Sequence, residues 1–230
     1  MRSDLVDGVF LDMYGTLTSG DRAAVESVCG RIVSEAGLSI SATELSVMWG
    51  ERFLNSLDFC NGPAFETLFD LEIRTLRETM TNLRREMDPV PYAEALREYW
   101  RNPPLQEDAR TFIASCPVPI CIVSNADHED VVAVVRKNEL GVADLVSSEE
   151  ARSYKPDRNI FDYALRKTGW RRDRVWHCGD SLHSDIGGAI AAGIRNVWLN
   201  RIHRIHDIGV HEPDHEVEDL IGLLALLSED

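Results

Sequence analysis

Short apolar runs that each end in a polar residue alternate with amphipathic helical patterns along most of this chain. The strand-like runs, rich in β-branched and apolar residues, occupy 8–13, 118–125, 145–150, 174–180 and 196–200. Helical patterns between them occupy 128–140, 157–169 and 184–193. A strand, a helix and a further strand, repeated in this way, form right-handed βαβ units. The chain is therefore predicted to be an α/β protein with a parallel sheet.

One long segment breaks this alternation. From 19 to 101 the sequence is rich in Glu, Arg, Leu and Met at helical spacing and contains no convincing strand. Proline-containing stretches punctuate its return to the sheet pattern, because prolines interrupt helices. We expect a helical unit at 19–101, inserted into a core made of 1–18 and 102–230.

Charge and hydropathy restrict the classes of partner. The chain has a formal net charge of -15, which would repel a phosphate backbone, so nucleic-acid binding is not expected. No apolar run is long enough for a membrane span, and the N-terminus lacks the apolar core of a signal peptide. We expect a cytoplasmic protein, a monomer or a homodimer, that binds a small anionic metabolite.

Polar clusters follow the predicted strands at their carboxyl ends. In an open parallel sheet the ligand crevice lies beyond these ends, so residues far apart in the sequence are expected to meet there. The clusters are Asp12, Ser124 with Asn125, Lys155, and Asp180 with Asp185.

These residue types suit displacement chemistry. A carboxylate at a strand end can act as a nucleophile and form a covalent intermediate. If Asp12 attacks an anion, like charges meet, and each pair of unit charges at ~4 Å costs about 4 kcal/mol at an effective dielectric constant of 20. Mg²⁺ between Asp12 and Asp180 would offset that repulsion, since this ion prefers oxygen ligands. Lys155 would neutralise further charge, and the Ser124 hydroxyl would bind substrate oxygens.

Four motifs in this order, "DMYGTL", "VSN", "KP" and "GDSLHSDIGGAIAAG", resemble those of the haloacid dehalogenase superfamily of hydrolases. The resemblance implies a Rossmann-like core with an inserted all-helical cap that selects substrates. It also implies Asp12 as nucleophile, Lys155 as charge stabiliser, and Ser124, Asn125 and Thr16 as substrate-binding residues. Its metal ligands would be Asp12, Asp180, Asp185 and the Tyr14 carbonyl.

Tyr14 departs from the pattern of the superfamily's phosphatases. Those enzymes usually place a second Asp two residues after the nucleophile, where it protonates the leaving alkoxide. A tyrosine there resembles the 2-haloacid dehalogenases, whose halide leaving group requires no proton. Asp180 instead favours a metal-dependent phosphatase, because the dehalogenases need no metal and lack this acid. An uncompensated carboxylate beside Asp12 would repel a carboxylate substrate.

We give more weight to Asp180 than to Tyr14, because loss of general acid–base help typically slows a reaction by 10²–10⁴-fold without abolishing it. The expected function is thus Mg²⁺-dependent hydrolysis of small phosphomonoesters through an aspartyl-phosphate. The missing acid could be offset by a good leaving group, by a proton from the cap or by Tyr14 itself. Two alternatives stay open. One is a metal-independent 2-haloacid dehalogenase that forms an ester on Asp12, and the other is a low-turnover homologue that binds phosphate.

Some further side chains have both a functional and an ordinary explanation. The histidines of the segment His203–His215 fit no standard zinc spacing and are expected in an exposed loop. His128 and His183 flank the predicted site and could supply a proton. Three cap arginines are most simply on a solvated helix face, although they could also reach a substrate anion: Arg52, Arg74 and Arg77.

Overall fold

A single parallel sheet forms the centre of the protein in the computed structural model, which describes residues 6–205 and 211–229. The strand order is β3-β2-β1-β4-β5-β6, and every neighbouring pair is parallel. The strands are β1 (Gly8–Leu11), β2 (Ile120–Ser124), β3 (Asp144–Ser147), β4 (Val175–Gly179), β5 (Arg195–Leu199) and β6 (His215–Val217). This confirms the predicted α/β fold with a Rossmann-like parallel sheet.

The central strands are buried on both faces. β1 and β2 read as nearly continuous apolar runs, GVFL and ICIVS, and every residue in them is buried. Such runs are typical of parallel strands covered on both sides by helices. The register places Leu11 opposite both Ile122 and Cys178. The carboxyl ends of β1, β2 and β4 therefore meet at one edge of the sheet.

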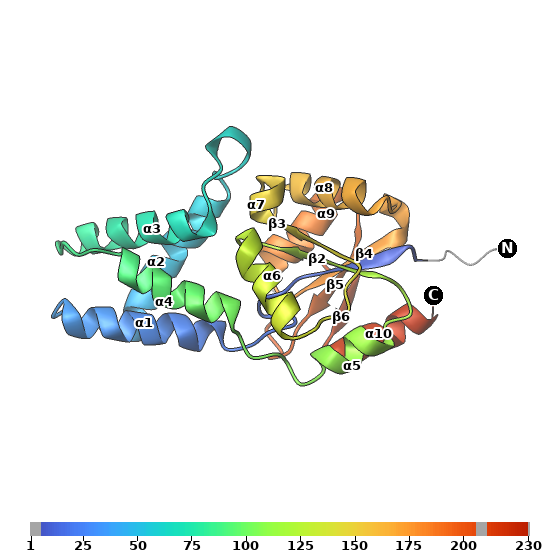
Figure 1. Cartoon of the computed structure of the whole chain (residues 1–230), viewed down its shortest axis with the longest axis horizontal. Helices are drawn as coiled ribbons and strands as arrows, with labels where there is room; N and C mark the ends of the chain where they lie inside the picture. The colour runs from blue at the N-terminus through green and yellow to red at the C-terminus, as the bar shows by residue number, and fades with distance from the viewer. Residues whose placement is uncertain (1–5, 206–210, 230) are drawn as a thin grey trace.

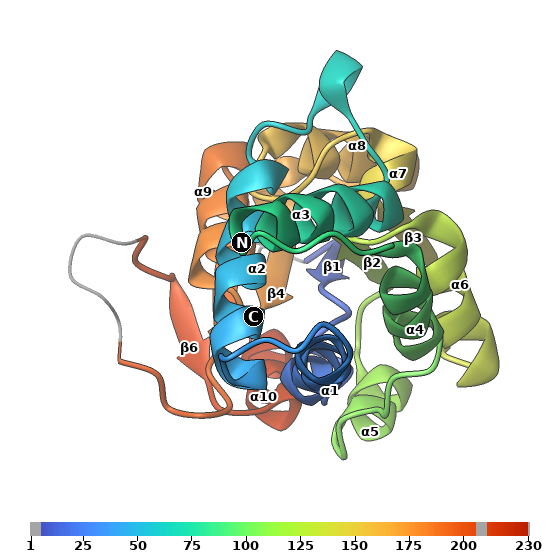
Figure 2. The same cartoon turned by 90° about the vertical axis from the view of Figure 1, so that its left-hand side faces the viewer.

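Helices cover the two faces according to the alternation of side chains along β1. Val9 and Leu11 pack into one apolar cluster, and Phe10 packs into another on the opposite face. The first face is covered by α5 (Ala109–Ser115), α6 (His128–Lys137) and α10 (Leu220–Glu229). The second is covered by α8 (Arg158–Thr168) and α9 (Gly188–Ala192), with the short α7 (Ser148–Ala151) beside them (Figure 2).

The segment between β1 and α5 forms a helical unit at one end of the molecule (Figure 1). Ser41 and Glu44 cap α2 reciprocally, and Thr67 caps α3; such caps satisfy amide groups that the first helical turn leaves unpaired. The four helices pack around an apolar core of their own. They are α1 (Asp21–Glu35), α2 (Ala42–Leu57), α3 (Leu68–Asn82) and α4 (Val90–Arg101).

Three details differ from the sequence-based expectation. The strand expected at 145–150 ends at Ser147, and Ser148–Ala151 form α7. The helix expected at 184–193 is divided into a π-helical turn, Leu182–Gly187, and α9. The histidine-rich segment is not a loop throughout, because His215 begins β6 and its ring stacks on Trp176. His206 lies outside the described residues. No helix in the described part of the chain is long and apolar enough to cross a membrane.

Candidate active site

Asp12 is held at the carboxyl end of β1 by the tight turn that follows it. Its backbone N–H donates to the Cys178 carbonyl at 3.0 Å, and only 6% of the residue is exposed. Gly15 follows with φ of 83°, a left-handed conformation in which a Cβ would lie 2.7 Å from an Asp180 carboxylate oxygen. Glycine at this position therefore lets the β1 turn approach the acid that follows β4.

Lys155 lies between two carboxylates. Its Nζ is 2.6 Å from Asp12 Oδ1 and 2.6 Å from Asp185 Oδ1, and only 2% of the residue is exposed. Asn125 fixes the Lys155 backbone, because its Oδ1 accepts from Lys155 N at 2.7 Å and its Nδ2 donates to Lys155 O at 3.0 Å. Although burial disfavours the charge, the two acids hold the pKa of Lys155 above its usual range. The ammonium therefore remains charged beside the predicted nucleophile.

Both carboxylate oxygens of Asp185 accept hydrogen bonds or lie in ion pairs. Oδ1 lies 2.9 Å from His177 Nε2 as well as against Lys155, and Oδ2 accepts from Ser181 N at 3.0 Å. Burial works against ionisation, but Lys155 and His177 outweigh it and lower the pKa of Asp185. A bare glycine backbone permits this packing, since a Cβ on Gly179 would lie 2.1 Å from Asp185 Cγ. Asp185 can therefore anchor the Lys155 ammonium.

Asp180 has a cation of its own. Arg204 Nη2 lies 3.5 Å from Asp180 Oδ2 and also donates to the Asp180 carbonyl. Sequence reasoning did not identify Arg204, because it lies beyond β5 and no strand end indicates it. Burial, aided by the charge of Asp185, raises the pKa of Asp180 to about 6, although Arg204 opposes this. Burial also raises the pKa of Asp12 to about 7, against the charge of Lys155.

The three acids form the one group among the described residues that could hold a metal ion. Carboxylate oxygens of Asp12, Asp180 and Asp185 all lie within 4.8 Å of one another. Burial, and to a smaller extent the neighbouring carboxylates, raise the pKa values of Asp12 and Asp180, and a divalent cation would favour their ionised forms. Asp12 and Asp180 thus fit such an ion, whereas both oxygens of Asp185 are engaged. Ligation by the Tyr14 carbonyl stays a prediction.

Two of the three side chains predicted to bind substrate line the pocket, and the third does not. Ser124 ends β2 and lines the pocket, and its buried Oγ has no hydrogen-bond partner in the described structure. Asn125 also lines the pocket. Thr16 is buried in the β1 turn and does not line it; its carbonyl accepts from Arg201 at 3.0 Å. Ser124 is therefore the donor best placed to meet a substrate oxygen.

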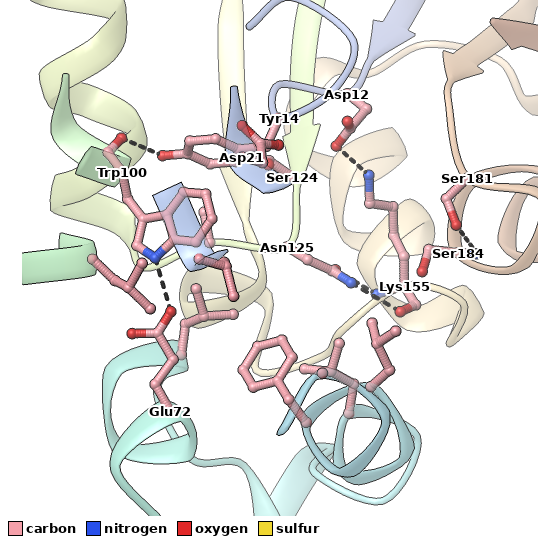
Figure 3. Close-up of a pocket in the computed structure, with 18 of the residues that line it drawn as sticks. Asp12, Tyr14, Asp21, Glu72, Trp100, Ser124, Asn125, Lys155, Ser181 and Ser184 are labelled. Atoms are coloured by element: carbon pink, nitrogen blue, oxygen red, sulfur yellow. Dashed lines mark hydrogen bonds and ion pairs between the residues drawn. The ribbon is translucent and has the colours of Figure 1, made fainter. Parts of the chain in front are cut away.

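Tyr14 points toward the cap. Its hydroxyl donates to the Trp100 carbonyl at 2.8 Å, and the two rings pack edge to face with centroids 5.3 Å apart (Figure 3). Burial raises the pKa of the Tyr14 phenol above its usual range. A neutral phenol that already donates its proton to a carbonyl cannot act as a base in this arrangement. Trp100, the residue of α4 that contacts Tyr14, is a second residue of the site that the sequence did not indicate.

A cavity of about 380 Å³ connects these groups to the cap. The cap contributes mostly apolar walls, and Lys155 is the one cationic side chain that lines it within the described residues.

The cap arginines that could have reached a substrate anion do not line this cavity. Arg52 pairs with Glu78, and Arg74 pairs with Glu66 and Glu78. The histidines considered as proton donors do not line it either; His183 pairs with Asp58 at 3.1 Å on the surface.

Comparison with known proteins bears directly on the chemistry of this site. The sequence model of the haloacid dehalogenase-like hydrolases matches residues 6–193. An (S)-2-haloacid dehalogenase of Pseudomonas fluorescens is 27% identical over 221 residues, which cover 94% of this chain and 93% of that protein. Pyrimidine 5'-nucleotidase YjjG of Escherichia coli is 43% identical over 98 residues, but these cover only 40% of this chain and 43% of the nucleotidase. The structure of L-2-haloacid dehalogenase from Xanthobacter autotrophicus superimposes with a TM-score of 0.80 at 17% identity, over 97% of this chain and 99% of that one, which shows the shared fold.

These comparisons contradict the expectation of a Mg²⁺-dependent phosphomonoesterase. The relatives that match along the whole chain are named (S)-2-haloacid dehalogenases, whereas the nucleotidase matches less than half of it. The phosphatase expectation failed because of the charge balance around Asp180. Asp180 was treated as uncompensated without a metal, yet Arg204 approaches it and Lys155 pairs with Asp12. The motifs, the fold and the matched sequence model together show that the chain belongs to the haloacid dehalogenase-like hydrolases.

Proposed function

We propose that this protein hydrolyses (S)-2-haloacids to 2-hydroxy acids of inverted configuration, through an ester on Asp12. The observation that carries the proposal is the pairing of Asp12 with Lys155, together with Tyr14 two residues further on. Tyr14 donates its proton to the Trp100 carbonyl, so the turn offers no acid for a leaving group. A halide leaves without a proton, which makes such an acid unnecessary. The names of the relatives that span the chain support the same reaction.

In the first step an Asp12 carboxylate oxygen attacks C2 of the substrate. A C–O bond forms as the carbon–halogen bond breaks from the opposite side, so the configuration at C2 inverts and halide departs with the bonding electrons. Lys155 Nζ, 2.6 Å from Asp12 Oδ1, fixes the orientation of the nucleophile. The free Ser124 hydroxyl donates to the substrate carboxylate.

In the second step water attacks Cγ of the Asp12 ester. Asp180 is the residue best suited to accept the water proton, because its pKa is raised to about 6 and a general base works best with a pKa near the operating pH. Asp185 is less suitable, since Lys155 and His177 keep its pKa low. Collapse of the adduct breaks the Cγ–O bond to the substrate, and the departing alkoxide takes up the proton that Asp180 accepted from water. The Asp12 carboxyl group then loses its own proton to solvent, which regenerates the nucleophile and leaves the inverted hydroxy acid.

A divalent cation takes no part in either step. If Mg²⁺ binds, Asp12 and Asp180 would hold it and it would supply charge neutralisation. Three statements stay predictions from the sequence: binding of Mg²⁺, a cytoplasmic location, and assembly as a monomer or homodimer.

Halide release from the two enantiomers of 2-chloropropionate tests the proposal. We expect chloride and lactate from the (S) enantiomer, with the same rate in EDTA and in Mg²⁺, because Lys155 and Arg204 supply the positive charge. An aryl phosphate assayed in parallel should release little phosphate. Mg²⁺-dependent phosphate release without any chloride would overturn the proposal, and so would the absence of both products.

A further inference from the structure

The cavity above Asp12 is larger than a short haloacid requires. Its volume is about 380 Å³, and a water molecule takes a share of roughly 30 Å³ of the liquid, so the cavity has room for about a dozen waters. Its cap walls are mostly apolar and include Val25, Trp49, Phe53, Leu57, Leu96 and Trp100. A substrate as small as 2-chloropropionate would leave most of this apolar surface facing water, which is unfavourable.

Glu72 is a polar exception in these walls. It belongs to α3 and lines the cavity, with 4% of the residue exposed. In Figure 3 it lies on the far side of the drawn residues from Asp12 and Lys155. Trp100 Nε1 donates to its Oε1 at 2.8 Å, and this is its one side-chain hydrogen bond among the described residues. The other carboxylate oxygen is therefore available to a ligand.

The other acids that line the cavity on the cap side have hydrogen-bond donors of their own. Asp127 accepts from Leu68 N at 2.6 Å and Phe69 N at 3.1 Å. Asp130 pairs with Arg101 at 2.6 Å, and Asp21 accepts from the Tyr99 hydroxyl at 2.6 Å. Glu72 differs from Asp127 and Asp130 because neither a cation nor a backbone amide among the described residues contacts its carboxylate; Asp21, like Glu72, accepts from one neutral side-chain donor. Burial raises the pKa of Glu72 to about 8, so at neutral pH its carboxyl group carries a proton and can both donate and accept a hydrogen bond.

We propose that the natural substrates are 2-haloacids with a bulky, mainly apolar side chain whose polar end hydrogen-bonds to Glu72. This inference rests on the proposed dehalogenase activity and names its substrate class. The apolar body would lie against the Trp49, Phe53 and Trp100 walls while C2 faces Asp12. Glu72 would then be a specificity-determining residue that contacts the substrate far from the reacting carbon.

Three bromoacids and three variants test this assignment. The substrates are 2-bromopropanoate, 2-bromo-3-phenylpropanoate and its para-hydroxyphenyl analogue. We expect kcat/KM for the phenyl compound to exceed that for 2-bromopropanoate at least about tenfold, because it buries more apolar surface. The para-hydroxyl should add roughly a further tenfold by bonding to Glu72.

The three variants distinguish loss of the contact between Glu72 and the substrate from a general loss of activity. Glu72→Leu should remove the preference for the hydroxylated substrate over the phenyl one, measured as the ratio of their two kcat/KM values so that any general loss of activity cancels. Glu72→Gln should retain most of the preference, because the amide also hydrogen-bonds. Glu78→Gln, on the same helix but outside this cavity and paired with Arg52 and Arg74, should match the wild type. Equal kcat/KM for all three substrates, or a preference that survives in Glu72→Leu, would overturn the assignment.

A binding measurement distinguishes failure of the substrate class from failure of the chemistry. The halogen-free acid 3-(4-hydroxyphenyl)propanoate should raise the melting temperature of the wild type and of Glu78→Gln, but raise that of Glu72→Leu less. If this shift appears and no bromoacid releases bromide, the dehalogenase proposal is wrong and the cavity assignment stands. If 2-bromopropanoate is turned over and the shift is absent, the dehalogenase proposal stands and the cavity assignment is wrong.

Discussion

The two ends of the cavity are built in opposite ways. At the sheet end, charges face one another at short distance, with Lys155 Nζ 2.6 Å from both Asp12 and Asp185. At the cap end the walls are apolar, and Glu72 has an indole N–H as its hydrogen-bond partner. Under the proposed function, the sheet end would carry out the displacement and the cap end would determine which substrate side chain fits.

The difference follows from how each end is held. Asp12 and Asp180 follow parallel strands whose register brings them together, and Asn125 holds the Lys155 backbone, so the positions of these residues depend on backbone hydrogen bonds. Cap residues reach the site from helices that meet the core through the apolar packing of Leu57 and Leu71 on Tyr154 and through several polar groups. Among these are the α3 amides on Asp127 and the Tyr14 hydroxyl on the Trp100 carbonyl. Substitutions at the sheet end should therefore change the rate for every substrate, and substitutions at the cap end should change the order of preference.

The largest effect is expected for Asp12→Asn. An amide is a far poorer nucleophile than a carboxylate, so halide release should fall by about 10⁴-fold or more for short and bulky substrates alike. Halide assays on both classes check this, with circular dichroism to confirm folding. Asp58→Asn, at an exposed residue bonded to His183, is the control. Activity of Asp12→Asn within tenfold of the wild type would exclude an Asp12 ester.

Asp180→Asn should separate the two chemical steps. If Asp180 activates water, its loss slows hydrolysis of the ester by about 10²–10⁴-fold and leaves attack on C2 nearly intact. We therefore expect a burst of about one halide per enzyme molecule, followed by slow turnover, and the ester should be visible by mass spectrometry of the intact protein. The exposed Asp173, paired with Arg171, provides Asp173→Asn as control. A lost burst would instead place Asp180 in the first step.

The pH dependence should report the ionisation of Asp12. Its raised pKa means that the nucleophilic carboxylate is lost as pH falls through about 7, so kcat/KM should fall about tenfold for each further unit below that value. The slope should be the same for short and bulky substrates, because the effect belongs to the sheet end. A profile that stays flat to about pH 5 would show that Lys155 holds Asp12 ionised well below neutrality.

The smallest effect is expected for Tyr14→Phe. The change removes the hydrogen bond to the Trp100 carbonyl and leaves the ring contact, so kcat/KM should fall by less than about tenfold. Tyr92→Phe, which removes a phenol bonded to Glu35 within the cap, is the matched control. A fall of more than about 10²-fold in Tyr14→Phe would show that the phenol takes part in proton transfer.

Most of the sheet end could be predicted from the sequence because strand ends identify it. Asp12 and Asp180 directly follow β1 and β4, Ser124 ends β2, and parallel strands bring such ends together. Lys155 lies beyond β3 and α7 and was identified by its motif. Arg204 and Glu72 could not be found in this way. Arg204 reaches Asp180 from a segment beyond β5, and Glu72 lies in a helix whose face toward the cavity is defined only by packing. The charge balance at Asp180 depended on Arg204, so the choice between phosphate and halide chemistry could not be made correctly from the motifs alone.

A single turnover in water labelled with heavy oxygen, with EDTA present and enzyme in excess over (S)-2-chloropropionate, tests the Asp12 ester most directly. The product hydroxyl oxygen should come from Asp12, so the lactate should be unlabelled and the peptide containing Asp12 should gain the heavy isotope. Labelled lactate with an unlabelled Asp12 peptide would show direct attack of water on C2 and would contradict the account.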